Sequence, residues 1–402
     1  MSLKRTLLLD RNYFPAAQLF LSLSLMFGTW VVYIPSITQK LNMSKGDLGI
    51  ALFAAAVGSL ISIYIGKKLV VRFGEGKLAL GGVLGMTLFI FSFFLATSFL
   101  QLTVLMLFFG LTSGILQIGL NTVVSTLEKR DKISIMSSCH GYFSLGGLFA
   151  AGFGTVLLML LKNPVLHISL AALTVVWLQI LTYKKFIHLN SSLEPVRATE
   201  RKPARLNPRL VALAVIAVAA MVSEGAIADW SSLYLRDVAL APETQWGLGY
   251  AAFSLTMTLG RFMGDHFSQR FGPWQILMNG FVISILGFGF VLVAQPMLTL
   301  IGFAFVGAGF SIIVPEAYRL STQIEGVSPA NGIAFMAGSA YLGFLGGPVA
   351  LGAIAEKSGL HTSFVFIMAL AVVGLATTFF VWLKLLVPIK LNLLRIFVRN
   401  KA

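Results

Sequence analysis

Charged side chains are scarce in this chain of 402 residues. Asp, Glu, Lys and Arg make up 11% of the sequence, hydrophobic residues make up 57%, and the mean hydropathy is +0.87. Soluble domains carry about 25% charged residues, so this chain has too few to cover a water-facing surface. Most of its outer surface must therefore face lipid, which excludes a single large soluble core.

Acidic residues are scarcer than basic ones, with 15 Asp and Glu against 30 Lys and Arg and a net charge of +15. Such an excess can indicate nucleic-acid binding. Here the basic residues lie in short clusters between apolar spans, with no basic stripe interleaved with aromatic residues. The clusters follow the positive-inside rule for membrane proteins, and we expect no nucleic-acid partner.

Motifs for cofactor or metal chemistry are missing as well. Cys139 is the single cysteine, which excludes a disulfide framework and a cysteine-based metal site. The sequence contains no Gly-x4-Gly-Lys-Ser/Thr string and no His-Glu-x-x-His string. We therefore expect no cofactor, no metal, no ATP drive and no enzymatic activity.

What the chain does contain is a series of apolar segments, each near the ~20 residues that a helix needs to cross a bilayer. The segments fall near 17–37, 48–66, 78–97, 100–127, 134–161, 165–183, 211–235, 246–264, 274–294, 297–320, 330–355 and 362–386. The pattern predicts an all-α polytopic membrane protein with twelve transmembrane helices.

A long polar stretch with three prolines separates the sixth segment from the seventh. It predicts an N-terminal six-helix half over 1–186, a linker over 187–209 and a C-terminal half over 210–402. With the N-terminus inside, the outer loops hold few basic residues, namely Lys40, Lys45, Lys162, Arg236 and Lys357. Nearly all the others then lie inside, so we expect a bacterial inner-membrane protein with both termini in the cytoplasm.

The two predicted halves share an internal repeat. Arg72-Phe73-Gly74 follows the second segment and Arg270-Phe271-Gly272 follows the eighth, an offset of 198 residues. In each copy a glycine, Gly66 or Gly264, stands six residues before the arginine. Two signals at one offset indicate duplicated six-helix halves around a midplane site.

These loops resemble the loop signature of the major facilitator superfamily, and the resemblance covers the whole chain. The C-terminal copy, Gly260 to Gly272, is the fuller one, because the N-terminal copy has Val70 and Val71 where an acid would be expected. Three stretches further resemble the YbjJ-like branch, which is distantly similar to fucose permeases: Asn121–Glu128, His140–Gly147 and Glu224–Ser231. The resemblance implies two rocking halves, a central solute site and a gate at the loops. The gate residues that it implies are Arg72, Arg261, Asp265 and Arg270.

Three acids fall inside predicted spans, where an ionisable side chain costs at least ~2.5–3.5 kcal/mol and is a functional candidate. Glu224 lies deepest and is the first candidate for proton coupling; the alternative is a structural hydrogen-bonding carboxyl. Asp229 lies nearer the outer surface, where a helix-end role is equally consistent. Glu316 stands three residues before Arg319, so a local ion pair is the alternative to coupling.

Polar and aromatic side chains in the spans are the other candidates. His140 can titrate near neutrality or form an interhelical hydrogen bond. Gln117 and Asn121 share one helix face and predict either solute contact or helix–helix hydrogen bonds. Trp30 and Tyr33, three residues apart, predict either stacking on a sugar-like ring or a place in the interfacial aromatic belt. A further candidate for solute contact is Trp230, which lies in the segment resembling the border of the central cavity.

The sequence thus predicts a secondary transporter that moves a small polar solute, sugar-like by preference, by alternating access and coupled to protons. A proton-driven efflux antiporter of drugs or metabolites is the alternative, and a non-transporting scaffold or channel is a different class. The duplicated halves favour transport. The expected partners are the solute, protons and the lipid bilayer, and the chain is expected to be a monomer.

Overall fold

A computed structural model describes residues 12–132, 135–161, 163–190, 207–327 and 329–399. Within these ranges the regular elements are helices. The first half contains α1 (Phe14–Lys40), α2 (Lys45–Phe73), α3 (Glu75–Phe93), α4 (Phe99–Asp131), α5 (Met136–Leu161), α6 (Pro164–Thr182) and the short η2 (Tyr183–Lys185). The second contains α7 (Pro208–Asp237), η3 (Glu243–Gln245), α8 (Leu248–Phe271), α9 (Pro273–Leu292), α10 (Pro296–Phe310), α11 (Ile313–Ser321), α12 (Pro329–Ser358) and α13 (Leu360–Arg399).

The predicted all-α, twelve-span fold is confirmed, with one difference. The span expected over 297–320 is broken into α10 and α11 at Ser311 and Ile312, so the helix labels run to α13. In the described part of the chain, nine segments are long and apolar enough to cross a membrane, and one of these joins α10 to α11. The helices α5, α8 and α12 complete the twelve. They contact α8, α5 and α2 of the opposite half, respectively.

Local sequence signals set several helix ends. Ser44 and Asp47 form a capping box at the start of α2, in which each side chain binds the other residue's backbone N–H. Gly74 separates α2 from α3 with φ of 80°, and Gly272 separates α8 from α9 with φ of 81°. A positive φ favours glycine. The glycines of the two Arg-Phe-Gly copies therefore make the same sharp turn in each half.

The repeat extends to helix packing. A Cβ on Gly110 of α4 would lie 1.8 Å from the carbonyl oxygen of Ala55 in α2. The corresponding glycine 197 residues later, Gly307 of α10, would place a Cβ 2.2 Å from the carbonyl oxygen of Phe253 in α8. Only glycine permits such approaches between helices, which are the close contacts that stabilise helix pairs in lipid.

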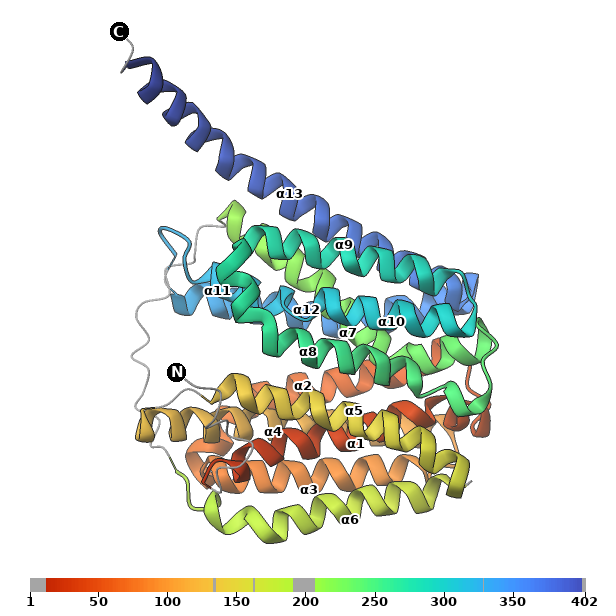
Figure 1. The fold of residues 1–402 in the computed structure, drawn as a ribbon. Helices are drawn as coiled ribbons and strands as arrows, with labels where there is room; N and C mark the ends of the chain where they lie inside the picture. The colour runs from red at the N-terminus through yellow and green to blue at the C-terminus, as the bar shows by residue number, and fades with distance from the viewer. Residues whose placement is uncertain (1–11, 133–134, 162, 191–206, 328, 400–402) are drawn as a thin grey trace.

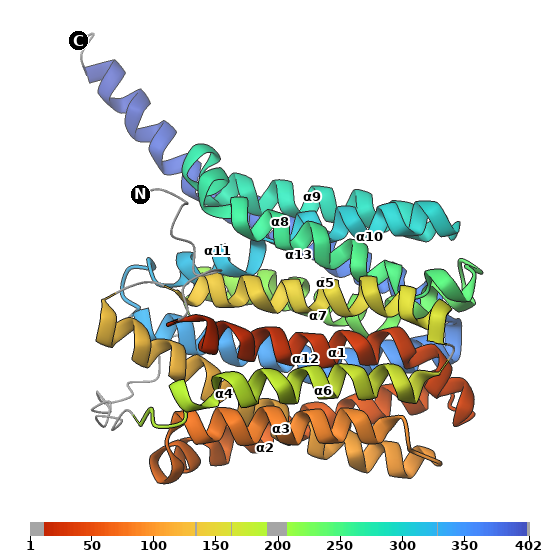
Figure 2. The same cartoon turned by 60° about the horizontal axis from the view of Figure 1, so that its bottom comes forward.

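The two sets of helices lie as two layers, α1–α6 in one and α7–α13 in the other (Figure 1). Seen after a turn of 60°, α1, α5, α7 and α12 occupy the middle of the bundle (Figure 2). The seam between the layers is built mainly by α2 with α12, α5 with α8, and α1 with α7. The predicted linker falls largely on 191–206, outside the described residues, so the domain bounds stay a prediction.

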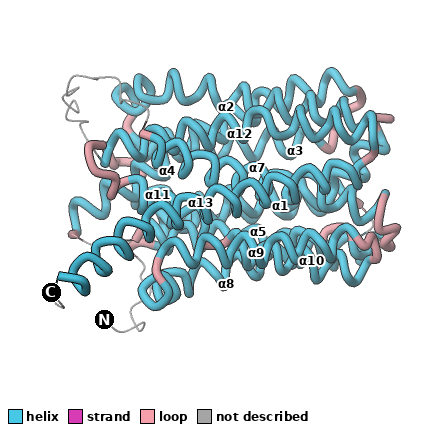
Figure 3. The backbone as a smooth tube through the Cα atoms, turned by 90° about the horizontal axis from the view of Figure 1, so that it is seen from above, coloured by secondary structure: helices cyan, strands magenta, loops and turns pink. Residues whose placement is uncertain are grey.

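The helices run nearly parallel through the bundle, so it has two ends (Figure 3). We call the end that carries Phe14 and Pro208 the near end, and the end that carries Lys40 and Asp237 the far end. The last part of α13 projects beyond the near end (Figure 1). This helix has 40 residues, about 60 Å at 1.5 Å per residue, which is about twice the thickness of a hydrocarbon core.

Polar contacts across the seam gather at the far end. Lys45 of α2 forms an ion pair with Asp237 of α7. Arg236 Nη1 donates to the carbonyl oxygen of Pro35 at 2.6 Å, and the Gly46 N–H donates to Glu356 Oε2 at 3.0 Å. Together these contacts, which we call the far-end latch, join α1 and α2 to α7 and α12.

Candidate solute site between the two halves

An ion pair occupies the middle of the seam. Arg261 Nη2 of α8 lies 3.2 Å from Glu224 Oε1 of α7, and Arg261 Nη1 donates to Ser144 Oγ of α5 at 3.1 Å. One guanidinium therefore contacts an acid of its own half and a hydroxyl of the other half. We call Glu224, Arg261 and Ser144 the central triad.

The position of the central triad matches the depth at which transporters bind solutes. Glu224 is 16 residues from the start of α7 and 13 from its end, about 24 Å and 20 Å along the helix. The side chains of Glu224 and Arg261 are 26% and 23% exposed. They are thus neither fully buried nor fully exposed. Charges at this depth are costly unless paired, which the ion pair provides.

Hydroxyl groups lie beside the central triad. A Cβ on Gly147 of α5 would lie 3.0 Å from Ser24 Oγ of α1 and 3.2 Å from Tyr250 Oη of α8. The glycine therefore makes room for both hydroxyls at the seam. Ser24 is 1% exposed, and its hydroxyl has no hydrogen-bond partner among the described residues. Tyr250 is within electrostatic range of Glu224 and Arg261.

His140 is the candidate of α5 that lies closest to the near end. Its side chain is exposed, and its ring packs edge-on against Phe20 with centroids 5.1 Å apart. Arg261 is close enough to act on it electrostatically. No interhelical hydrogen bond to His140 side-chain nitrogens is found in the described part of the chain, so the titratable ring stays a candidate.

Among the described residues, the side-chain amides of Gln117 and Asn121 form no hydrogen bond with another helix, which was the alternative to solute contact. Asn121 Nδ2 donates to the carbonyl oxygen of Gln117 at 2.7 Å, which is a bond within one helix. The Gln117 side chain is exposed and Asn121 is half-buried. Their contact with a solute stays a prediction.

Trp30 and Tyr33 do not lie in the interfacial aromatic belt, and their contact with a solute stays a prediction. Both are 1% exposed. Trp30 packs edge-on against Phe93 of α3, and Tyr33 Oη lies 3.0 Å from His167 Nδ1 of α6. The aromatic-belt prediction is wrong because α1 is surrounded by other helices and does not face lipid. In this structure both rings belong to the interior of the first half.

Glu316 forms the local ion pair that was the alternative to a coupling role. It pairs with Arg319 in α11 and accepts a hydrogen bond of 2.9 Å from Ser268 Oγ of α8. Ser268 thereby ties α8 to α11 near the near end. This arrangement satisfies the carboxylate within the second half, away from the seam.

The remaining gate candidates lie at the near end. Arg72 and Arg270 are exposed, and their guanidinium groups lie over the rings of Phe73 and Phe271 at 5.3 and 5.4 Å. The side chain of Asp265 lies outside the described residues. Arg261, which was expected to join this gate, belongs to the central triad instead, because it lies ten residues before the end of α8.

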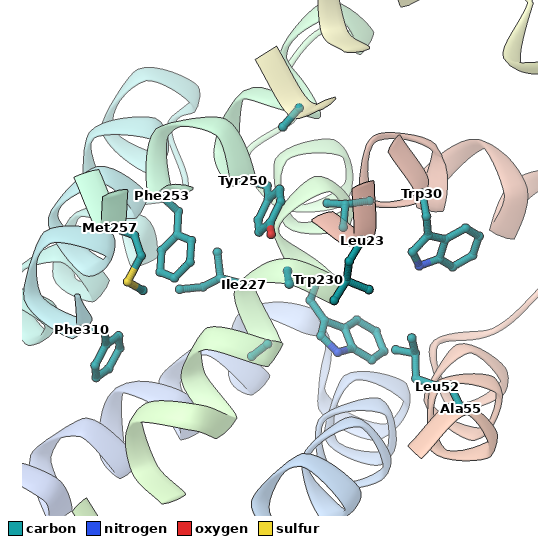
Figure 4. Packing of buried hydrophobic residues seen from close by; sticks show 14 of the residues in the cluster. Leu23, Trp30, Leu52, Ala55, Ile227, Trp230, Tyr250, Phe253, Met257 and Phe310 are labelled. Carbon is teal, nitrogen blue, oxygen red and sulfur yellow. The ribbon is translucent and has the colours of Figure 1, made fainter. Parts of the chain in front are cut away.

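Asp229 and Trp230 are buried on α7, 7% and 0% exposed. They lie beside a small cavity between α7 and α12. In Figure 4 the side chains of Trp230 and Tyr250 lie near Leu23 of α1. The helix-end alternative for Asp229 does not fit, because the side chain lies eight residues before the end of α7.

Sequence reasoning missed two interhelical polar contacts of the first half. His167 carried no local pattern, yet it is 4% exposed and bonded to Tyr33. Gln18 and Gln179 exchange two hydrogen bonds of 3.1 and 2.9 Å between α1 and α6. A polar residue within an apolar span was the available signal. Among the described residues there is no cluster of three His, Cys, Asp or Glu able to hold a metal.

The chain resembles known proteins over most of its length. A family model described as Major Facilitator Superfamily matches residues 16–324. An uncharacterised MFS-type transporter of Yersinia pestis is 29% identical over 351 residues, 86% of this chain and 89% of that protein. The membrane protein MosC of Rhizobium meliloti is 28% identical over 373 residues, 91% and 89% of the two chains.

Solved structures show the same fold. The nucleoside transporter NupG, as a point mutant, superposes with a TM-score of 0.73 at 13% identity, covering 92% of this chain and 99% of that one. A bacterial homologue of the human lysosomal transporter Spinster, described as inward-facing and occupied, has a TM-score of 0.66 at 15% identity, covering 92% and 96%. The branch predicted from the three sequence stretches stays a prediction.

Proposed function

Because the chain belongs to the major facilitator superfamily, a family of membrane transporters, we propose that it is a secondary transporter that carries a small polar solute by alternating access. The observation that carries the proposal is the central triad. The Arg261 guanidinium contacts both halves, so the binding of a solute there depends on how the two halves are placed relative to each other. Two six-helix halves around a midplane site are the architecture that alternating access uses.

The seam supports the assignment of one of the two access states. Far-end contacts close the seam between α1, α2, α7 and α12. Toward the near end, no hydrogen bond or ion pair between described residues joins the halves beyond Arg261 and Ser144. With the near end in the cytoplasm, as the basic clusters predict, this is the inward-facing state of an inner-membrane transporter.

The chemistry of the central triad favours a neutral polar solute. Glu224 accepts hydrogen bonds, Arg261 donates them, and together they carry no net charge. Ser144 and Tyr250 add hydroxyl groups that both donate and accept. A sugar-like solute with several hydroxyls matches such a mixed site. A strongly charged solute would instead be repelled by the member of the ion pair that carries the same charge. Uptake coupled to protons is the direction that we propose.

Binding and flux measurements test this function. A thermal-shift screen of the purified protein against a metabolite library identifies binders, and counterflow in proteoliposomes then shows whether a binder is carried. We expect sugar-like binders whose affinity falls at least tenfold in Glu224→Gln and Arg261→Lys. Glu316→Gln is the matched control, because it removes an acid from another ion pair of the second half.

Four outcomes decide between the classes. Counterflow of a binder that depends on the central triad supports a transporter. Binding and flux that ignore both substitutions refute the central triad as the solute site. Binding without flux in any condition refutes transport and favours a scaffold, and expulsion of the binder from cells favours the efflux alternative.

A further inference from the structure

A second polar site lies on α7, below the surface of the second half and apart from the central triad. Asp229 and Trp230 are both more than nine-tenths buried. In the described part of the chain, Trp230 Nε1 is buried without a hydrogen-bond partner. No hydrogen bond or ion pair is found there for the Asp229 carboxyl either. A buried polar group that lacks partners costs free energy and calls for an explanation, such as a bound water or a proton.

The two side chains line a cavity between α7 and α12. Its other walls include Gly225 and Leu351, together with Gly343, Gly347 and Pro348 of α12. The centre of a water molecule has about 10 Å³ of room there, enough for about one water. One carboxyl and one indole N–H supply the two polar partners that such a water needs at minimum.

Glycine and proline explain why this part of α12 leaves a cavity. A Cβ on Gly343 would lie 3.0 Å from Val222 Cγ2 of α7, so glycine permits close packing of the two helices. Pro348 lies inside α12 and lacks the N–H that would bond the carbonyl four residues earlier. The two helices thus pack closely at Gly343, whereas the backbone hydrogen bonding of α12 is interrupted at Pro348, beside Asp229.

The charged groups around Asp229 do not neutralise a carboxylate. On α7 the nearest is Glu224, whose charge is paired with Arg261 of α8. Tyr250 of α8 is within electrostatic range and uncharged at neutral pH. The described cavity walls on α12 are apolar.

Among the described residues, the other elements packed against α7 add no cation at this depth. In α11 the ion pair of Glu316 and Arg319 lies at the near end. In α13 the ring of His361 stacks on Tyr234 and bonds the carbonyl oxygen of Leu292 at the far end. The ion pair of Lys45 with Asp237 also lies at the far end.

From this geometry we infer that Asp229 is the proton-binding carboxyl of the transporter, held as a neutral acid that shares one water with Trp230 Nε1. A carboxyl without a cation or donors in an apolar cavity takes the neutral form. The cavity does not suit a metal cation, which takes about six oxygen ligands, because it offers one carboxyl and an indole donor.

Release of the proton follows from movement of α12 against α7. When the helices separate at Pro348, water enters, the carboxylic acid gives its proton to water, and Asp229 becomes a solvated carboxylate. Closing around a protonated Asp229 reverses the step. The coupling role rests on the proposed function, whereas the protonated state of Asp229 does not. Proton coupling is therefore assigned to Asp229 and not to Glu224, whose carboxylate is paired with Arg261.

Infrared difference spectroscopy of the purified wild-type protein tests the site directly. A protonated carboxylic acid has a C=O stretch separate from that of a carboxylate, and the band shifts in D₂O. We expect this band at neutral pH in wild type, its loss in Asp229→Asn and a shifted band in Trp230→Phe, which removes the N–H. Glu224→Gln and Ser231→Ala, two other positions on α7, serve as matched controls and keep the band unchanged.

The outcomes separate the site from the transport function. Absence of the band from wild type at neutral pH overturns the inference, as does its undiminished presence in Asp229→Asn, or a band that appears only when sodium is removed. The wild-type spectrum and the Trp230→Phe shift apply even if Asp229→Asn fails to fold. Where flux is measured, Asp229→Asn should retain solute counterflow and lose accumulation driven by a pH gradient at least tenfold. A band without any solute flux leaves the site in place and refutes the proposed function alone.

Discussion

The far end and the middle of the seam hold the two halves together in different ways. At the far end, Lys45, Asp237, Arg236 and Glu356 tie helices of both halves through several polar contacts. In the middle, one guanidinium reaches one hydroxyl across the seam. In the proposed mechanism the far end closes and opens, whereas the middle responds to the solute that lies between the halves.

The largest effect is expected at the middle. Arg261→Ala leaves Glu224 unpaired within the membrane and removes the contact with Ser144. Losing the partner of a partly buried charge costs about 2 kcal/mol, less than for a fully buried pair because both side chains are about a quarter exposed. We expect solute binding to be lost and the thermal midpoint to fall by several degrees. A variant that binds and carries solute as wild type does would contradict the role of the central triad.

The next effect concerns close packing at the far end. A Cβ on Gly49 of α2 would lie 2.9 Å from the carbonyl oxygen of Pro348 and 3.1 Å from Gly352 Cα of α12. Gly49→Ala therefore forces the helices apart in the observed state, at about 1–3 kcal/mol. We expect a shift of at least fivefold toward the state in which the far end is open. Gly81→Ala, where a Cβ meets nothing within 4 Å, is the control, and equal behaviour of the two variants would show that the seam does not move there.

A smaller effect is expected from the far-end ion pair. Asp237→Asn removes an anion that faces both Lys45 and Arg236. A partly exposed pair contributes about 1 kcal/mol, which changes a balanced two-state equilibrium about fivefold. Labelling of a cysteine at Asn42, an exposed far-end position, reports the change. Labelling by an impermeant reagent from outside the cell also tests the predicted orientation, because a cysteine at Lys129 of the near end should be shielded.

The smallest effect is expected at the near end, in the opposite direction. In the observed state Arg270 is exposed and lies over its neighbour Phe271. If the near-end gate forms only in the other state, Arg270→Ala destabilises that state by less than about 1 kcal/mol and favours the observed one. A shift in the same direction as Asp237→Asn would rule out opposed gates.

The fold was predictable because the bilayer imposes its own pattern. Long apolar segments, basic clusters and an offset of 198 residues were visible along the chain, and Gly74 and Gly272 make the same turn in the structure. The pair of Glu316 and Arg319 was predictable too, since residues three apart share a helix face. These features depend on local sequence or on the solvent.

Side-chain contacts between different helices were not predictable. Glu224 and Arg261 lie on α7 and α8, and their pairing depends on the relative depth of two helices. The same holds for Tyr33 with His167, which a single span cannot indicate. The interfacial belt was one of the two alternatives for Trp30, yet this side chain is buried because α1 is enclosed by its neighbours. Which side chains pair across helices depends on how deep each helix lies relative to its neighbours, and composition and spacing do not contain this information.

Two distances measured in one protein test alternating access most directly. Spin labels at Arg72 and Gln323 report the near end across the seam, and labels at Asn42 and Glu243 report the far end, each pair in a Cys139→Ala background. We predict that the far-end distance lengthens and the near-end distance shortens together in Asp237→Asn relative to wild type. If each label pair keeps one unchanged distance in Asp237→Asn, or if both distances lengthen together, the result would contradict the transporter mechanism.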